Sequence, residues 1–383
     1  MGMLVLFGIK MNNLRFSILA KQKKARAGEI LTDHGTIKTP VFMPVGTIGS
    51  VKAIFPKELK KLDIDIILAN TYHLMQRPGD KLIKEMGGLQ KFINWHKPIL
   101  TDSGGFQVWS LSRLKKISKD GINFKSHIDG RQIFLSPEKA IDIQFNLNSD
   151  ISMVLDECTE FPVSLERAQE SMELSMCWAK RCKNIFKPRD GYGCFGIVQG
   201  GMFEELRKKS ASELCEIGFD GYALGGLSVG ETHDQMINVI KSAIGYLDEK
   251  KPRYVMGVGR PVDIIRSVEQ GIDMFDCVLP TRFGRNGRAF TMAGELNLRN
   301  SKYSNDESPL DKDINCFASN EFSKSYIHHL VKNNEILSSM ILSLHNIAFY
   351  KKMMCDIRES ILTNTFEKTK NLYLNENEKF KKT

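Results

Sequence analysis

The sequence is poor in the features that define several protein classes. Its eight cysteines are scattered among 383 residues, with no CxxC pair or other close metal-ligand spacing. This pattern excludes a disulfide-stapled scaffold and indicates a reduced, cytoplasmic compartment. The sequence also contains no internal repeat of fixed period and no sustained low-complexity tract, which excludes a solenoid and a largely disordered chain.

A long hydrophobic run is also missing. The apolar opening MGMLVLFGIK is far shorter than a membrane span, follows no basic region and has no small-residue cleavage site. We therefore expect no secretory signal and no membrane association. Met11 is expected to be the real start, which makes residues 1–10 a non-native or disordered extension.

The remaining composition is that of a large globular protein. With 42% hydrophobic and 26% charged residues, the chain can bury a sizeable core, and its length implies two domains or one of the larger single folds. A net charge of +9 favours a polyanionic partner such as nucleic acid. A cytoplasmic protein from an AT-rich genome that favours lysine would show a similar excess.

Short apolar runs rich in β-branched residues alternate with segments of helical or turn character. These runs are VFMPV near residue 41, IDIILAN near 64, PILTD near 98, ISMVLDE at 151, CFGIVQG at 194, GYALGG at 221, RYVMGVG at 253 and GIDMFDC at 271. Eight strands alternating with helices predict an α/β protein with a (β/α)8 TIM-type barrel over residues 11–299. Residues 300–383 begin with a polar linker and indicate a helical subdomain with a basic C-terminal tail, packed on the barrel.

Polar or glycine residues follow most of these runs. Among them are three carboxylates, Asp102, Asp156 and Asp276. Because the active site of such a barrel gathers at the carboxyl ends of its strands, the three are candidates for chemistry. The alternative for any one of them is an ordinary helix N-cap, a position where Asp is favoured.

Six blocks near the ends of the later runs carry a resemblance to a known family. The blocks are TDSGGFQVWSL (101–111), VLDECTEFP (154–162), GIVQGG (196–201), GGLSVGE (225–231), YVMGVGRP (254–261) and MFDCVLPTRFGRNGRAFT (274–291). Together they closely resemble the bacterial tRNA-guanine transglycosylase (queuine tRNA-ribosyltransferase) family, over about residues 14–360. One DSGG or GxG would be weak support, whereas six blocks in this order are highly specific.

The resemblance implies a pentosyltransferase that exchanges the wobble guanine of certain tRNAs for a 7-deazaguanine, in queuosine modification. Swapping a base with retention at the anomeric carbon needs two displacements, through a covalent ribosyl-enzyme intermediate. By resemblance, Asp276 is the nucleophile. Asp102 then manages the proton on the departing guanine and on the incoming base.

The resemblance also implies a pocket that reads the edges of the base. Asp102 and Asp156 would accept hydrogen bonds from its donor-rich edge, while Gln199 and the Gly225–Gly226 backbone would bond its carbonyl side. An unmatched base would leave these buried groups unpaired, which is the source of specificity.

Further positions match the family's contacts to the ring itself. Phe106 and Met256 match residues that sandwich the base, although either one alone is more typical of a core residue. Leu227 leads to Glu231, which by resemblance recognises the substituent edge. Val229 between them is bulky, as in bacterial enzymes that use 7-aminomethyl-7-deazaguanine, and would crowd queuine.

Three arginines follow the proposed nucleophile closely. Arg282, Arg285 and Arg288 can hold the phosphates and base edges of a tRNA anticodon loop while guanine leaves its stack. The alternative is a solvated basic loop with no partner.

The resemblance fails at the family's structural zinc site, which is a CxCxxC run with a later histidine. Here the run holds Ile314, Cys316 and Ser319, followed by His345, so two of four ligands are missing. We expect no metal and no other cofactor, with Cys316 and His345 as buried structural groups. A non-standard site that recruits Cys355 is the alternative.

The family works as a homodimer, and one segment here suits that role. Phe322, Tyr326 and His329 share one face of a predicted helix, so they form either an interface or part of the core. Two other functions stay open: a non-catalytic tRNA-binding accessory subunit, and a barrel glycoside hydrolase. The hydrolase is disfavoured because only three tryptophans are available for a carbohydrate platform.

Overall fold

The computed structural model describes residues 14–111 and 115–378. The expected extension at residues 1–10 lies outside these ranges. Within them, eight parallel strands form one sheet in the order β4-β14-β13-β12-β11-β10-β6-β5. Their bounds are β4 Val41–Pro44, β5 Ile67–Ala69, β6 Ile99–Thr101, β10 Ile151–Met153, β11 Gly193–Val198, β12 Gly221–Leu224, β13 Arg253–Val255 and β14 Met274–Cys277.

The sheet closes on itself as a barrel. A parallel bridge joins Val45 to Leu68, and the Gly46 amide donates to the Leu68 carbonyl at 2.6 Å, so the ends of β4 and β5 meet. Each predicted apolar run contains one of these strands, which confirms the (β/α)8 prediction. The runs do not alternate between apolar and polar residues, as strands with one exposed face do, because both faces of a parallel barrel are covered.

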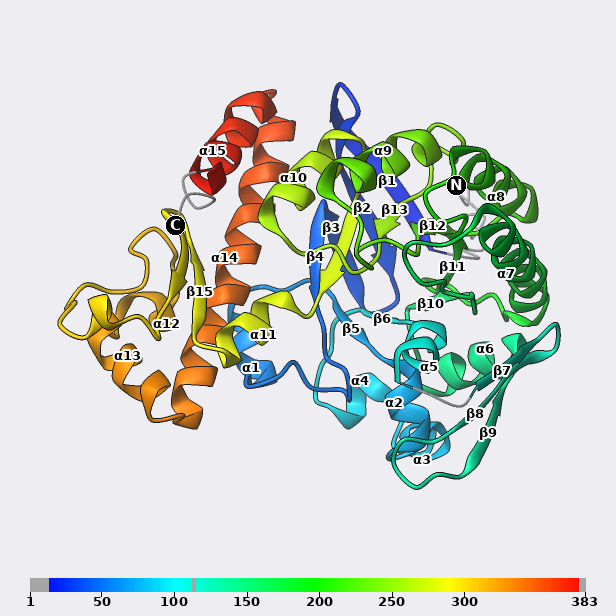
Figure 1. Ribbon diagram of the computed structural model, residues 1–383, viewed down its shortest axis with the longest axis horizontal. Helices are drawn as coiled ribbons and strands as arrows, with labels where there is room; N and C mark the ends of the chain where they lie inside the picture. The colour runs from blue at the N-terminus through cyan, green and yellow to red at the C-terminus, as the bar shows by residue number, and fades with distance from the viewer. Residues whose placement is uncertain (1–13, 112–114, 379–383) are drawn as a thin grey trace, which may run out of the picture.

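Helices surround the strands, as Figure 1 shows. Ser136, Ser164 and Thr232 each accept a hydrogen bond from the first turn of the helix that follows, so the chain marks these helix starts with capping side chains. The helices are α1 Pro56–Lys61, α2 Thr71–Gln76, α3 Asp80–Glu85, α4 Leu89–Phe92, α5 Gly105–Leu111, α6 Pro137–Asn146, α7 Leu165–Ile185, α8 Glu204–Ile217, α9 His233–Ile244, α10 Pro261–Glu269 and α11 Leu279–Arg285.

Three antiparallel elements accompany the barrel and were not predicted from the sequence. Their strands are mixed in polarity, so they lack the apolar runs of the barrel strands. They are the sheet of β1 Arg15–Gln22, β2 Ala25–Thr32 and β3 Gly35–Thr39, the sheet of β7 Lys115–Ser118, β8 Gly121–Lys125 and β9 Gln132–Leu135, and the hairpin of β15 Arg288–Thr291 and β16 Gly294–Asn297.

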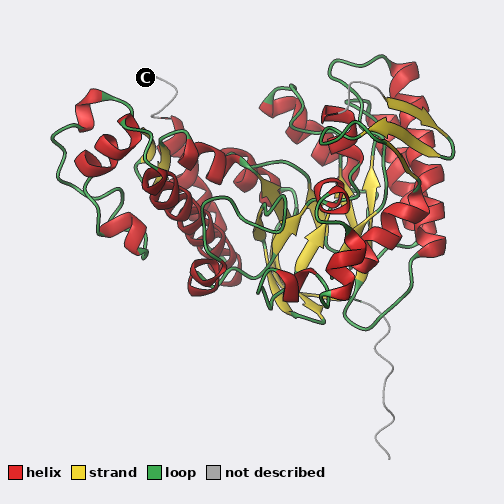
Figure 2. Ribbon diagram, turned by 90° about the horizontal axis from the view of Figure 1, so that it is seen from below, coloured by secondary structure: helices red, strands yellow, loops and turns green. Residues whose placement is uncertain are grey.

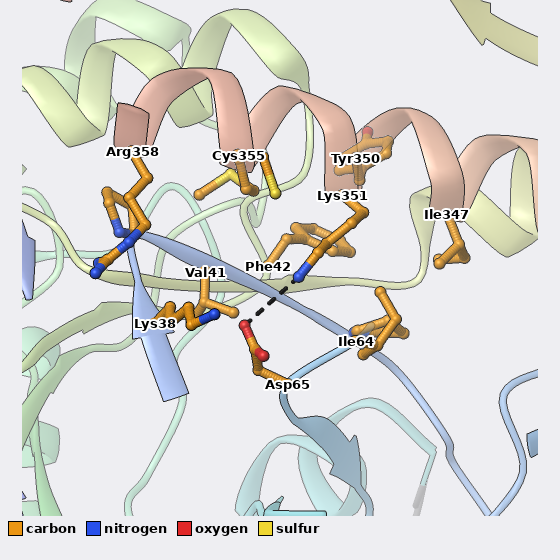
Figure 3. A pocket seen from close by; sticks show the side chains of 13 residues that line it. Lys38, Val41, Phe42, Ile64, Asp65, Ile347, Tyr350, Lys351, Cys355 and Arg358 are labelled. Atoms are coloured by element: carbon orange, nitrogen blue, oxygen red, sulfur yellow. Dashed lines mark ion pairs between the residues drawn. The ribbon is translucent and has the colours of Figure 1, made fainter. Parts of the chain in front are cut away.

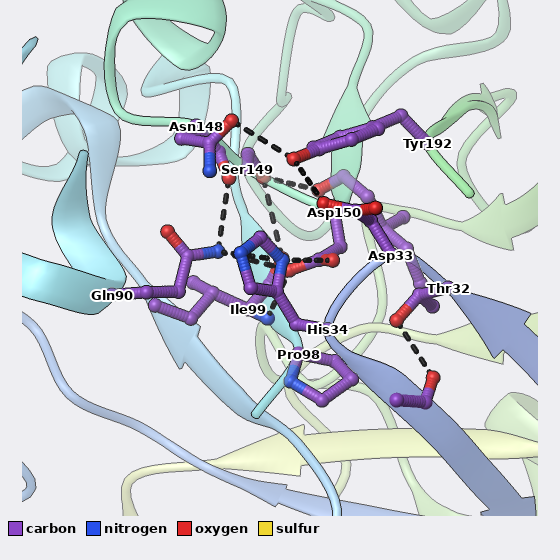
Figure 4. Close-up of polar contacts among 12 residues, drawn as sticks. Thr32, Asp33, His34, Gln90, Pro98, Ile99, Asn148, Ser149, Asp150 and Tyr192 are labelled. Atoms are coloured by element: carbon purple, nitrogen blue, oxygen red, sulfur yellow. Dashed lines mark hydrogen bonds and ion pairs between the residues drawn. The ribbon is translucent and has the colours of Figure 1, made fainter. Parts of the chain in front are cut away.

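The turn between β2 and β3 contacts the amino-terminal end of the barrel (Figure 4). His34 Nδ1 lies 2.7 Å from Asp150 Oδ1, and this hydrogen bond raises the pKa of His34. The other oxygen, Asp150 Oδ2, accepts from Gln90 Nε2 at 3.0 Å and from the Ile99 amide at 2.8 Å. One buried carboxylate therefore joins the N-terminal sheet to β6 and α4 at the end opposite the strand carboxyl ends.

The chain after residue 300 is helical, as expected, and lies beside the barrel (Figure 2). It contains η1 Ser301–Tyr303, α12 Phe317–Asn320, α13 Lys324–Lys332, α14 Ile336–Leu362 and α15 Phe366–Glu378. The domain boundary at residue 300 stays a prediction. None of the helices in the described ranges is long and apolar enough to cross a bilayer.

Helix α14 joins this region to the barrel. The Tyr350 and Phe42 rings pack with centroids 4.5 Å apart, and Arg358 Nη1 donates to the Gly28 carbonyl at 2.6 Å. Figure 3 shows the pocket that remains between α14 and β4, where Lys351 Nζ lies 3.6 Å from Asp65 Oδ2. The later turns of α14 thus cover the barrel between the N-terminal sheet and α11.

Candidate active site

Four predicted site residues lie at the carboxyl ends of barrel strands. Asp102 directly follows β6, Asp156 comes shortly after β10, Gln199 directly follows β11, and Asp276 lies near the end of β14. Parallel strands present these ends at one mouth of the barrel. Among the described residues, none of the three carboxylates accepts a hydrogen bond from a backbone amide in the first turn of the helix that follows it, so these contacts are not those of simple N-caps.

Asp102 is buried and held from the chain segment after β5. Its Oδ1 accepts from the Thr71 amide at 2.8 Å, and its Oδ2 accepts from the Asn70 side chain. Burial raises the pKa of Asp102 to about 7, and the nearby charge of Asp276 adds to the rise, although both hydrogen bonds oppose it. Asp102 can therefore exist in either protonation state near neutral pH, which suits a group that gives and takes a proton.

Asp276 is only partly buried, and its two oxygens differ. Oδ1 accepts from the Tyr254 hydroxyl at 2.5 Å and from the Gly257 amide at 2.8 Å. Within the residues that the structure describes, Oδ2 accepts no hydrogen bond. Burial raises the pKa of Asp276, while the two donors on Oδ1 favour its carboxylate form. The side chain is thus oriented through one oxygen and leaves the other available for attack.

Asp156 and Gln199 form a hydrogen-bonded pair across neighbouring strands. Gln199 Nε2 donates to Asp156 Oδ2 at 2.7 Å, and burial raises the pKa of Asp156 to about 6. A Cβ on Gly225 would lie 2.7 Å from Gln199 Nε2, and one on Gly226 would lie 2.8 Å from Gln199 Oε1. Glycine is needed here because any side chain would displace Gln199, and Gly226 also has a φ of +64°.

The predicted ring contacts lie around the same mouth. Phe106 begins the exposed face of α5, with 44% of its surface accessible, and its ring packs on Trp109 at 5.7 Å. Met256 follows β13 and is half-buried, with its amide bonded to the Leu224 carbonyl at 3.3 Å. Leu227 is buried beside the glycine pair. An exposed aromatic ring and a thioether are therefore available for a flat ligand.

The Glu231 carboxylate is hydrogen-bonded to backbone amides of its own loop. Its oxygens accept from the backbone amides of Ser228 at 2.5 Å, Val229 at 3.0 Å and Gly230 at 3.2 Å. This carboxylate therefore fixes the loop after β12, and any contact with a base substituent would be made from within that loop.

The three predicted arginines differ in whether their guanidinium groups are already paired. Arg282 and Arg285 are exposed on one face of α11, and neither forms an ion pair with any described residue. Arg288 pairs with Glu295 at 3.2 Å, and its guanidinium lies 5.0 Å from the Phe283 ring centroid. Arg282 and Arg285 are thus the better candidates for contact with a polyanion.

The region that resembles a zinc site is closed by direct hydrogen bonds. Ser319 Oγ lies 2.8 Å from His345 Nδ1, and His345 Nε2 lies 2.7 Å from the Phe290 carbonyl. Because a carbonyl only accepts, Nε2 carries the hydrogen and Nδ1 accepts from Ser319. Burial lowers the pKa of His345 to about 4, so the ring is neutral and both nitrogens are used.

These residues do not fit a tetrahedral metal site. Ile314 is buried but offers no ligand atom, and Cys316 is the one thiol of the run. In the described ranges, no group of three or more His, Cys, Asp or Glu side chains is placed to hold a metal ion. Cys355 follows His345 by almost three turns of α14, about 15 Å along the axis, which does not favour a site that recruits Cys355. The absence of zinc stays a prediction.

The aromatic stripe on α13 is a surface feature. Phe322 and Tyr326 have ring centroids 6.0 Å apart, Tyr326 is 41% exposed, and His329 is exposed as well. The alternative that the stripe belongs to the core is therefore wrong for Tyr326.

Sequence reasoning missed several residues that orient the site. Tyr254 lies within a buried apolar run, so it resembles a core residue, and only its hydroxyl contact with Asp276 distinguishes it. Thr71 contributes a backbone amide, which no sequence pattern marks. Arg207 lies in an amphipathic helix, where an arginine is normally assigned to solvent, yet it is fully buried.

The fold is that of a barrel protein with carboxylates gathered at the carboxyl ends of its strands, an arrangement that is typical of barrel enzymes. A family model described as Queuine tRNA-ribosyltransferase matches residues 21–379. Curated relatives of that name come from Rickettsia akari (strain Hartford), 53% identical, and from Rickettsia massiliae (strain Mtu5) and Rickettsia bellii (strain OSU 85-389), each 52% identical. Each alignment covers 351 residues, 92% of this chain and 97% of the relative.

The chain belongs to the queuine tRNA-ribosyltransferase family, as its sequence blocks led us to expect. It is accordingly an enzyme of the pentosyltransferase class.

Proposed function

We propose that this chain exchanges the wobble guanine of target tRNAs for a 7-deazaguanine, by double displacement. The observation that carries the proposal is the state of Asp276, with one oxygen held by Tyr254 and Gly257 and the other open, beside a carboxyl group of raised pKa. Family membership supports the same class of reaction.

The first displacement forms the covalent intermediate. Asp276 Oδ2 attacks the anomeric carbon of the ribose, a new C–O bond forms, and the bond to guanine breaks. The departing guanine takes up the electron pair, and protonated Asp102 supplies its proton. The pKa of about 7 makes the protonated form available at neutral pH.

The second displacement reverses these roles. Asp102, now a carboxylate, removes a proton from the incoming base, whose nitrogen then attacks the anomeric carbon from the face that guanine left. The C–O bond to Asp276 breaks, and its carboxylate is restored. Two inversions give net retention, as in retaining glycosidases.

The base is read by buried groups that need matching partners. Asp102 and Asp156 accept from its donor edge, and Gln199 and the Gly225–Gly226 backbone bond its carbonyl side. A base that lacks these groups leaves buried polar atoms unpaired, which costs affinity. Phe106 and Met256 provide the flat apolar contacts, and Leu227 lines the pocket.

The substituent side of the pocket favours a small 7-deazaguanine. Val229 occupies space next to Glu231, whose carboxylate already bonds the loop amides. We therefore assign 7-aminomethyl-7-deazaguanine as the incoming base, in preference to the larger queuine.

The tRNA anticodon loop is the macromolecular partner. Arg282 and Arg285 on α11 follow the nucleophile closely in the chain and carry charge free for phosphates, while Arg288 contributes after its pairing with Glu295 is given up. The net charge of +9 is consistent with such a partner. We place the protein in the cytoplasm, where it would encounter tRNA.

The stripe of Phe322, Tyr326 and His329 supports a homodimer in which α13 contacts α13 of the second copy, because exposed aromatic residues are enriched at interfaces.

No cofactor is needed for the displacement steps. The Ser319–His345 hydrogen bond stands where the family holds zinc, so the purified protein is expected to carry no stoichiometric zinc by elemental analysis. One zinc per chain would contradict this.

Label exchange tests the function. The enzyme is incubated with radiolabelled guanine and a tRNA that has guanine at the wobble position, and acid-precipitable label is counted. A tRNA with another wobble base is the control. Exchange into the first tRNA alone is expected. Binding of tRNA without exchange would instead indicate the accessory subunit, and hydrolysis of a sugar substrate would indicate the glycoside hydrolase.

A further inference from the structure

Arg207 of α8 is a buried cation behind the pocket for the base. Its Nη1 donates to the carbonyls of Val198 and Gly225, each at 2.8 Å, and its Nε donates to the Gly201 carbonyl at 2.9 Å. One guanidinium therefore joins the end of β11, the loop after it and the end of β12. The residue is fully buried.

No carboxylate in the described part of the chain pairs directly with Arg207, although the more distant charge of Glu231 favours its charged form. Among the described residues it forms no ion pair, and its buried Nη2 has no hydrogen-bond partner. Burial lowers the pKa of Arg207 to about 10, which still leaves it charged at neutral pH. An unpaired buried charge is costly to keep, and three backbone carbonyls could be satisfied by water or by neutral donors.

The peptide that Arg207 contacts also faces the base. The Gly225 carbonyl and the Gly226 amide belong to the same peptide unit, so a cation on the oxygen draws electron density away from the N–H group. Such polarisation makes the N–H a stronger donor. Gly226 is partly exposed, and its amide donates to no acceptor within the described part of the chain. This amide is therefore open to a ligand.

We propose that Arg207 is a positioning residue that strengthens the Gly226 N–H as a donor to the carbonyl oxygen of the base. It would thereby set the preference for 6-oxopurines over purines that lack that oxygen. This inference rests on the proposed function. The departing guanine gains negative charge that its carbonyl oxygen shares, so the same donor also favours the displacement step.

Two variants separate charge from shape. Arg207→Gln keeps a neutral donor that can reach the Gly225 carbonyl, and Arg207→Lys keeps the charge. Affinities for guanine and for 2-aminopurine, which lacks the 6-oxygen, are measured by calorimetry with the full chain. We expect Arg207→Gln to lower the ratio of the two affinities about fivefold or more. Arg207→Lys, which keeps the positive charge, should retain more of the preference for guanine over 2-aminopurine than Arg207→Gln does.

Arg181→Gln is the matched control. Arg181 also donates to backbone carbonyls, those of Lys119 and Asp120, and it pairs with Glu138, but none of these residues belongs to the candidate site. Its loss should leave the ratio unchanged. A merely structural role of Arg207 would weaken both ligands equally, whereas the proposed role weakens guanine selectively.

The outcomes distinguish this inference from the proposed function. If the unmodified enzyme binds guanine no better than 2-aminopurine, the proposed reading of the base fails. If it discriminates but Arg207→Gln discriminates equally well, the role of Arg207 is overturned. Should neither variant fold, difference infrared spectra of carbonyl-labelled guanine on the unmodified enzyme decide. A carbonyl stretch shifted to lower frequency than in water supports the role, and an unshifted stretch overturns it.

Discussion

Replacing Asp102 by asparagine should remove base exchange and yet stabilise the folded protein at alkaline pH. The carboxyl group is buried, and its pKa is raised from 3.8 to about 7 in the folded state. The unfolded chain loses this proton near pH 4, so the folded state binds more protons between these values. The stability of the unmodified protein therefore falls as pH rises through this window. The Asp102→Asn variant does not lose this stability, because asparagine does not ionise.

The size of the effect follows from the shift. A change of one pKa unit corresponds to about 1.4 kcal/mol. Asp102 therefore costs about 4 kcal/mol at pH 8, where it is ionised in the folded state, and roughly 1 to 2 kcal/mol at pH 5, where the folded state retains a proton that the unfolded chain has lost. The amide of the Asp102→Asn variant cannot accept from both Asn70 and Thr71 as well as a carboxylate does, which costs about 1 kcal/mol at every pH. The difference between the costs at the two pH values, roughly 2 to 3 kcal/mol, does not contain that constant term.

Urea unfolding of both proteins at pH 5 and pH 8 measures this quantity. The free energy of unfolding of Asp102→Asn, relative to the unmodified protein, should rise by roughly 2 to 3 kcal/mol from pH 5 to pH 8. The solvent-exposed Asp190→Asn is the control and should show a much smaller change. A difference that does not depend on pH would refute the raised pKa of Asp102. Its assignment as the proton-transferring group would then lose its physical basis.

Three further predictions follow from the site and the surface. Tyr254→Phe removes a donor to Asp276, so the acidic limb of the pH profile of kcat/KM should move up by about one unit; an unmoved limb would mean that the hydroxyl does not orient the nucleophile. Arg285→Ala should flatten the plot of log tRNA affinity against log salt by up to about 0.7, the value for one contact to a single strand, and an unchanged slope would place Arg285 outside the RNA interface. Tyr326→Ala should raise the dimer dissociation constant in a sedimentation dilution series, whereas a dimer as tight as the unmodified one would remove α13 from the interface.

The barrel was predictable because its strands are buried on both faces and end in polar residues. Asp102 and Asp276 stand at those ends, so both the fold and the candidate chemistry follow from the same pattern. The antiparallel β7–β9 sheet was not predictable, because its strands mix buried and exposed residues over only four or five positions.

The contacts that surround the site residues could not be predicted from the sequence. Tyr254 and Arg207 have the residue types and spacing of a core strand and an amphipathic helix, and only tertiary contacts give them their roles. The missing zinc ligands were visible in the sequence. What replaces them was not, because Ser319 reaches His345 only after α12 and α14 have packed together.

The most direct test of the account is the site of covalent attachment to RNA. A substrate tRNA is incubated with the enzyme without an incoming base, the reaction is quenched in denaturant, and the protease-digested adduct is mapped by mass spectrometry. We expect a ribose-linked RNA fragment on the peptide that contains Asp276, and no adduct with Asp276→Asn, although that variant still binds tRNA. An adduct on another residue, or base exchange that persists in Asp276→Asn, would contradict this expectation.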